Sequence, residues 1–194
     1  MIATLSTAAL AGGLSWASGI RLYMALFIAG WFGRMGWIDL PQSLDILQSP
    51  WVIVVTGLLT AIEFLVDKVP GLDSVWDAIH TFIRIPAGAI LAVAAMGHMD
   101  PAWSTVAALL GGTFAAGAHA TKAGSRAMIN TTPEPLSNWT ASFAEDGAVI
   151  GTLWAAFFHP WLLFIFLLLF FLFAIWLLPK LWRGLRWVFH RLAT

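Results

Sequence analysis

Two kinds of residue are scarce in this chain of 194 residues, and each scarcity excludes whole classes of protein. Cysteine is absent, so the chain has no disulfide framework, no thiolate metal site and no cysteine nucleophile. Charged residues make up only 10%, far below the usual share of about a quarter in a soluble domain. Hydrophobic residues make up 60%, and the mean hydropathy is +0.83. The composition therefore predicts an integral membrane protein.

The signatures of common enzymes are also missing. The sequence contains no HExxH zinc motif, no Gly-x-Ser-x-Gly elbow, no Walker loop and no glycine-rich dinucleotide fingerprint. Ten basic and ten acidic side chains cancel, so no net field attracts nucleic acid. We therefore expect a protein that is not an enzyme and that binds no nucleic acid. Its expected partners are membrane lipids.

The apolar stretches predict an all-α fold, because backbone groups in hydrocarbon need internal hydrogen-bond partners and no stretch alternates as barrel strands do. A membrane-spanning helix needs about 20 residues, and the connections carry prolines that end helices. We expect a polytopic transmembrane helical bundle of about six spans, at residues 3–33, 51–67, 73–97, 102–129, 138–158 and 161–178.

The chain divides into a transmembrane domain at 1–178 and a basic tail at 179–194. The tail carries Lys180, Arg183, Arg186 and Arg191, an excess of positive charge that is typical of a cytoplasmic segment. Its apolar and basic residues separate onto two helical faces, which predicts an amphipathic interfacial helix. With six crossings, both termini of this multi-pass protein are expected in the cytoplasm.

Small residues suggest how the helices pack. They recur in steps of four within 102–129 and predict that this helix approaches its neighbours closely, in the middle of the bundle. A short likeness between Ser18–Arg21 and Ala123–Arg126 raises the alternative of two inverted three-helix halves, an arrangement found in many transporters. The stripe of small residues comprises Ala108, Gly112, Ala116, Ala120 and Gly124.

Charged residues concentrate in two polar segments. The first runs from 63 to 88 and places one charged stripe on the end of the second span and another on one face of the third. Its candidate site residues are Glu63, Asp67, Asp73, Asp77, His80 and Arg84. Because a charge in hydrocarbon costs at least a few kcal/mol unless it is paired or hydrated, these side chains must face partners or a water-filled cavity.

The second polar segment runs from 116 to 146. His119, Lys122 and Arg126 share one face of the fourth helix, and Glu145 and Asp146 lie two turns into the fifth. Between them, Ser137 and Asn138 offer a cap whose amide end would favour an anion. Opposite charges are therefore expected to face a shared interior.

The strong cations of the predicted spans are expected to converge on one anionic group, because they cannot all face lipid. The planar fork of arginine suits phosphate or carboxylate. We therefore expect Arg21, Arg84, Lys122, Arg126, Ser137 and Asn138 to bind the substrate. Charge compensation or proton coupling is expected from Glu63, Asp67, Asp77, His80, His119, Glu145 and Asp146.

The same polar segments carry a resemblance to a known family. GLDSVWDAIHTFIRIPAGA and AHATKAGSRAMINTTPEPLSNWTASFAED, with the early SWASGIRLYMAL, resemble the bacterial membrane family named domain of unknown function 4126. The resemblance implies a small protein of the bacterial inner membrane whose polar segments are its characteristic motifs. It implies no activity.

Three functions remain open. The leading hypothesis is a transporter or flippase-like protein that binds an anionic, phosphate-bearing or lipid-linked substrate and needs no cofactor. The second is an ion or proton channel, a homo-oligomer lined by carboxylates. The third is an enzyme that acts on a lipid phosphate with Mg²⁺ held by Asp73 and Asp77, whose spacing suits a metal but also arises on any charged helix face.

Overall fold

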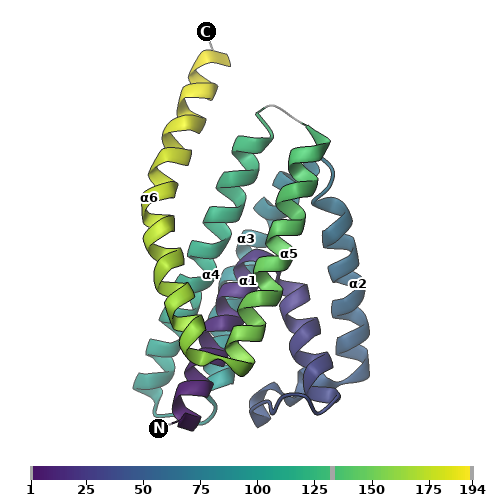
Figure 1. The fold of residues 1–194 in the computed structure, drawn as a ribbon, viewed down its shortest axis with the longest axis vertical. Helices are drawn as coiled ribbons and strands as arrows, with labels where there is room; N and C mark the ends of the chain where they lie inside the picture. Colours follow the sequence, from purple (N-terminus) through teal and green to yellow (C-terminus); the bar gives the residue numbers. More distant parts are fainter. Residues whose placement is uncertain (1, 132–133, 193–194) are drawn as a thin grey trace.

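The computed structural model describes residues 2–131 and 134–192, and in these ranges every regular element is a helix (Figure 1). Prolines begin four of the helices, at the position where a missing N–H costs nothing. The elements are α1 (Ile2–Arg34), the 3₁₀ helix η1 (Gln42–Gln48), α2 (Pro50–Val66), α3 (Leu72–Met96), α4 (Pro101–Ile129), α5 (Pro135–Phe158) and α6 (Pro160–Leu192).

The first helix is broken at Arg21, whose backbone angles of φ −142° and ψ 84° are not helical. A straight helix would separate Thr7 from Arg34 by about 40 Å. Instead, Thr7 and Ile38 line the same cavity of about 540 Å³. Figure 1 shows the first half of α1 rising from one end of the molecule and the second half returning to that end. α1 is therefore a helical hairpin with Arg21 at its tip.

This hairpin occupies the centre of the bundle, where it packs against every other helix. Small residues allow the close approach. A Cβ atom on Gly19 would collide with the backbone of Ala115, and one on Gly88 would collide with the side chain of Ala115. The Ser15 hydroxyl donates to the Gly88 carbonyl over 2.8 Å and fixes α1 against α3.

The expected stripe of small residues on α4 is displaced by one residue. The buried face of α4 carries Gly111, Ala115 and Ala118, whereas Ala120 of the expected stripe is exposed. α4 does pack closely, mostly against α3 and α1. The central place that we expected for α4 belongs to α1.

The outer surface is apolar, and charged side chains are buried inside beside an apolar core. Phe82 on α3 is 83% exposed and Trp51 on α2 is 79% exposed, while Arg21 and Arg84 are fully buried. An apolar exterior of this extent suits hydrocarbon and not water. The helices are in this respect membrane-like.

By length and hydropathy alone, the described residues contain two helices that can cross a membrane, Leu72–Met96 and Pro160–Val188. A third candidate arises if η1 and α2, which meet at a bend of 68°, count as one span. The expected count of six spans is therefore not confirmed. The inverted repeat is not confirmed either, because α1 breaks at Arg21 whereas α4 continues through Arg126.

The last helix continues without interruption through the segment that we expected to be a separate tail. α6 includes Pro179 and extends to Leu192. Figure 1 shows that α6 ends at the opposite end of the long axis from the start of α1. The expected placement of both termini in the cytoplasm is not confirmed.

Candidate functional site: a buried network of ion pairs

Ten charged side chains from five helices and one turn meet inside the bundle, and we call this set the ion-pair network. It contains four of the ten basic residues of the chain and six of the ten acidic ones. All four cations have side chains that are 0% exposed. The members are Arg21, Glu63, Asp67, Asp73, Asp77, Arg84, Lys122, Arg126, Glu145 and Asp146.

Lys122 lies at the centre of the network. Its Nζ atom is 2.9 Å from Asp67 Oδ2 and 3.5 Å from both Asp77 Oδ1 and Glu145 Oε2. Glu63 Oε1 follows at 3.9 Å. The ammonium also donates to the Ile20 carbonyl over 3.2 Å, one residue before the break in α1. Lys122 thus ties four carboxylates to the tip of the hairpin.

Arg84 joins α2 to α3 and orients a histidine. Its Nη2 pairs with Glu63 Oε1, and its Nη1 donates to Asp77 Oδ1 over 2.6 Å. Since a guanidinium only donates, His119 Nδ1, 3.2 Å from Nη1, must be the acceptor. The His119 Nε2–H then points at Thr81 Oγ1, 2.7 Å away. His119 is therefore held as the neutral Nε2–H tautomer.

Arg21 binds the carboxylates on the other side of Lys122. Its guanidinium is 3.1 Å from Asp67 Oδ2, 2.5 Å from Asp146 Oδ1 and 3.6 Å from Glu145 Oε2. It also donates to Ser142 Oγ over 2.8 Å. The tip of the hairpin is thereby fixed to α5 and to the turn that follows α2.

Arg126 is the most fully bonded cation of the network. It binds Glu145 with two parallel hydrogen bonds of 2.8 and 2.9 Å, the bidentate geometry that arginine favours. Its Nη1 donates to the Asp67 carbonyl and to Asn138 Oδ1. Asn138 donates in turn to Asn130, whose amide donates to Asp73 Oδ1 over 2.7 Å. Two asparagines thus link Arg126 to Asp73.

The charges of the network do not balance. Six carboxylates and four cations leave a formal charge of −2 when all are ionised, a costly state in a low-dielectric interior. Within the described residues, one oxygen of each of the four deepest carboxylates accepts no hydrogen bond. These atoms are Glu63 Oε2, Asp67 Oδ1, Asp73 Oδ2 and Asp77 Oδ2. The network therefore contains buried hydrogen-bond acceptors that no donor of the described residues satisfies.

Two expected site residues lie apart from the network. His80 stacks on Trp76, donates from Nδ1 to the Trp76 carbonyl and accepts from the Tyr23 hydroxyl at Nε2. Ser137 donates to the Glu134 carbonyl, and Glu134 rather than Ser137 is the cap of α5. The other expected substrate-binding, charge-compensating and proton-coupling residues are brought together.

The two expected magnesium ligands, Asp73 and Asp77, bind different partners. Asp73 accepts from the Gly71 and Ser74 amides and faces Arg126, whereas Asp77 faces Arg84 and Lys122. In the ranges that the structure describes, no group of three or more acidic or histidine side chains is arranged to hold a metal ion.

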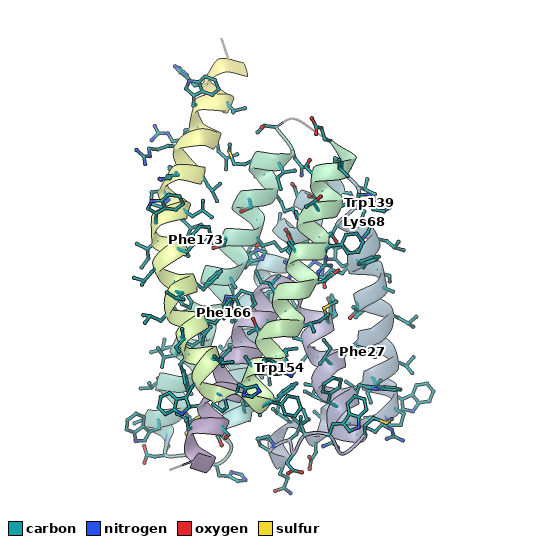
Figure 2. All side chains as sticks on the ribbon, in the orientation of Figure 1. Phe27, Lys68, Trp139, Trp154, Phe166 and Phe173 are labelled. Carbon is teal, nitrogen blue, oxygen red and sulfur yellow. The ribbon has the colours of Figure 1, made fainter. Side chains whose placement is uncertain are left out.

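Lys68 lies beside the network, in the turn between α2 and α3. Its ammonium donates to Ser142 Oγ over 3.3 Å and lies 2.9, 4.9 and 5.6 Å from the ring centres of Phe64, Phe143 and Trp139. Figure 2 shows Lys68 beside Trp139. Partial burial lowers the pKa of Lys68 below its ordinary value.

A family model described as "Domain of unknown function (DUF4126)" matches residues 8–180. The chain belongs to this family. Every member of the ion-pair network lies within the matched residues, and the match ends before the last turns of α6. No curated protein and no solved structure matches the chain.

Sequence reasoning missed Ser142 and Asn130, which bond to Arg21 and Asp73 of the network. Ser142 carried a usable signal, because it lies three and four residues before Glu145 and Asp146 and so shares their side of α5. Asn130 gave no such signal in the sequence. It bonds to Asp73 and Ser74 only because the start of α3 lies beside the end of α4 in the folded chain.

Proposed function

We propose that this member of the family is a multi-pass membrane transporter of flippase-like type, which carries an anionic, phosphate-bearing substrate and couples its movement to protons. The observation that supports it most is the ion-pair network, buried at the break of a helical hairpin. Buried charge at a broken helix is a common feature of substrate and ion sites in transporters.

Arginine geometry favours an anion as substrate. Arg126 already holds one carboxylate in bidentate fashion, and a phosphate group can take the same place. The displaced Glu145 would then take up a proton, because an unpaired carboxylate is costly in this interior. Anion binding and proton uptake are in this way linked through one residue.

The arrangement in Figure 1 supports a specific topology. We propose that α2 to α6 cross the membrane and that the α1 hairpin enters and leaves on one side. The basic end of α6, with Arg183 and Arg186, would lie in the cytoplasm by the positive-inside rule. The first residues of α1 would then face the opposite side of the bacterial inner membrane.

Flux through reconstituted vesicles tests the proposal. Two probes are used: fluorescent phosphatidylglycerol with dithionite quenching, and entrapped radiolabelled glycerol phosphate. The variant Arg84→Leu/Glu63→Gln/Asp77→Asn removes one arm of the network without leaving an unpaired charge. We expect it to lose flux, while the surface control Arg34→Leu keeps it. If the triple variant is folded and moves both probes at the wild-type rate, the proposal is wrong.

The two other functions predict different results. A channel would conduct protons with no anion present, and its current would vanish in Asp77→Asn. A magnesium enzyme would be stabilised by Mg²⁺, and Asp73→Asn would abolish that gain. We expect neither result, because Asp73 and Asp77 face different cations.

A further inference from the structure

An apolar groove of about 370 Å³ leads from the outer surface to the ion-pair network. Its lining comes from α1, α4, α5 and α6. Phe166, Phe170 and Phe173 form the aromatic wall, and Figure 2 shows Phe166 and Phe173 at successive levels of α6. The α5 side carries Ala141, Ala144 and Ala148, which leave space because their side chains end at Cβ.

The groove ends on charged residues. Lys122 and Glu145, 3.5 Å apart, belong to both the groove and the network. The Glu145 side chain is 14% exposed, whereas Lys122 is buried. A molecule in the groove therefore meets Glu145 first, and behind it two of the three cations that Glu145 binds, Lys122 and Arg126.

The groove also contains one polar group without a partner. Trp16 is only 2% exposed and lines the groove, and its indole N–H has no acceptor among the described residues. A buried indole N–H usually finds an acceptor. The occupant of the groove is therefore expected to carry an oxygen atom beside its apolar part.

We propose that the groove binds one hydrocarbon chain of an anionic lipid, with the lipid phosphate at Lys122 and Arg126. The inference rests on the proposed function and narrows its substrate from anions in general to lipid-linked anions. The apolar walls take the chain, the Trp16 N–H donates to an ester oxygen, and the phosphate competes with Glu145 for Lys122 and Arg126. A chainless anion would leave the apolar walls unfilled.

A second apolar cavity provides a matched control. It has a volume of about 200 Å³, lies between α1, α3 and α4, and is lined by residues such as Met99 and Ala107 without any charged side chain. A lipid chain could enter either cavity for its apolar character alone. Only the groove offers cations to a phosphate.

Native mass spectrometry of the full chain, titrated with phosphatidylglycerol, phosphatidylcholine or glycerol phosphate, tests the proposal. We expect phosphatidylglycerol to bind at least about tenfold more tightly than phosphatidylcholine, a difference of about 1.4 kcal/mol. Ala148→Trp, which fills the groove, should remove this preference, while Ala107→Trp in the second cavity should keep it. Glu145→Gln should strengthen phosphatidylglycerol binding, because it removes the competing charge.

The outcomes separate this inference from the proposed function. If Ala148→Trp binds and moves phosphatidylglycerol like the wild type, the groove assignment is wrong, while the proposed function stands. If glycerol phosphate is transported as well as the lipid, the site takes anions without a chain and the inference fails alone. If the triple network variant moves both probes normally, the proposed function fails whatever the groove binds.

Discussion

Replacement of Arg84 by leucine is expected to destabilise the protein severely, because it leaves two carboxylates buried without their main partner. Glu63 and Asp77 are 0% and 1% exposed, and Lys122 would remain their nearest cation at 3.9 and 3.5 Å. Breaking a buried ion pair by removing one partner costs about 3–5 kcal/mol. For a chain of this size each kcal/mol lowers the Tm by about 2–4 °C, so a fall of about 6–20 °C is expected.

The same reasoning predicts a rescue. Arg84→Leu/Glu63→Gln/Asp77→Asn removes the charges together, and replacement of a whole buried ion pair is often neutral or stabilising. Its Tm should return to within a few degrees of the wild type, although His119 still loses the hydrogen bond from Arg84, a loss of about 1 kcal/mol. Arg34→Leu is the control, since exposed Arg34 is bonded to the Gln48 carbonyl. A surface change of this kind costs about 0.5 kcal/mol or less.

Tryptophan fluorescence during heating in detergent measures all three variants, since the chain has 12 tryptophans. The reasoning would be refuted if the single and the triple variant lost the same stability, because the unpaired charges would then not be the cause. It would also be refuted if Arg84→Leu unfolded at the temperature of Arg34→Leu.

Two further predictions concern packing and topology. Gly88→Ala should lower the free energy of unfolding by about 1–3 kcal/mol, because its Cβ would collide with Ala115. In the control Gly151→Ala the new Cβ meets nothing within 4 Å, so the Tm should stay unchanged or rise. Equal shifts in the two variants would contradict the packing. Because the chain has no cysteine, single substitutions can report sidedness. Cysteines that replace Leu5 and Asp39 should be labelled by a thiol reagent from one side of the membrane, and a cysteine that replaces Thr131 from the other side. Labelling of positions 5 and 39 from opposite sides would show that α1 crosses the membrane.

Much of the site could be predicted from the sequence, because a charged side chain in hydrocarbon must face either an opposite charge or water. Helical spacing placed Asp77 and Arg84 on one face and Lys122 and Arg126 on another, and the structure brings both faces together. Helical spacing also predicted that Glu145 and Asp146 face the same interior, where Arg21 and Arg126 bind them.

The break in α1 could not be predicted in the same way. The stretch around Arg21 is apolar and rich in small residues, contains no proline, and is long enough for one helix. What stabilises the break lies elsewhere in the chain: Lys122 bonds to the Ile20 carbonyl, and Asp67, Asp146 and Ser142 hold the guanidinium. A local pattern carries no information about such partners, so the sequence predicts a single span where the structure has a hairpin.

The break and the charge excess of the network are connected. Two of the carboxylates that hold the Arg21 guanidinium, Asp67 and Asp146, belong to the set whose six negative charges exceed four positive ones. In the proposed transport cycle, a proton taken up by Asp146 would reduce the charge excess of the network and at the same time weaken one of the bonds that fix the tip of the hairpin. Asp146 is 13% exposed, whereas Asp67 is fully buried, so of these two carboxylates Asp146 is the one that a proton from outside can reach. If the protein is the proton-coupled transporter proposed above, we expect proton uptake at Asp146 to be the step at which coupling to hairpin movement begins.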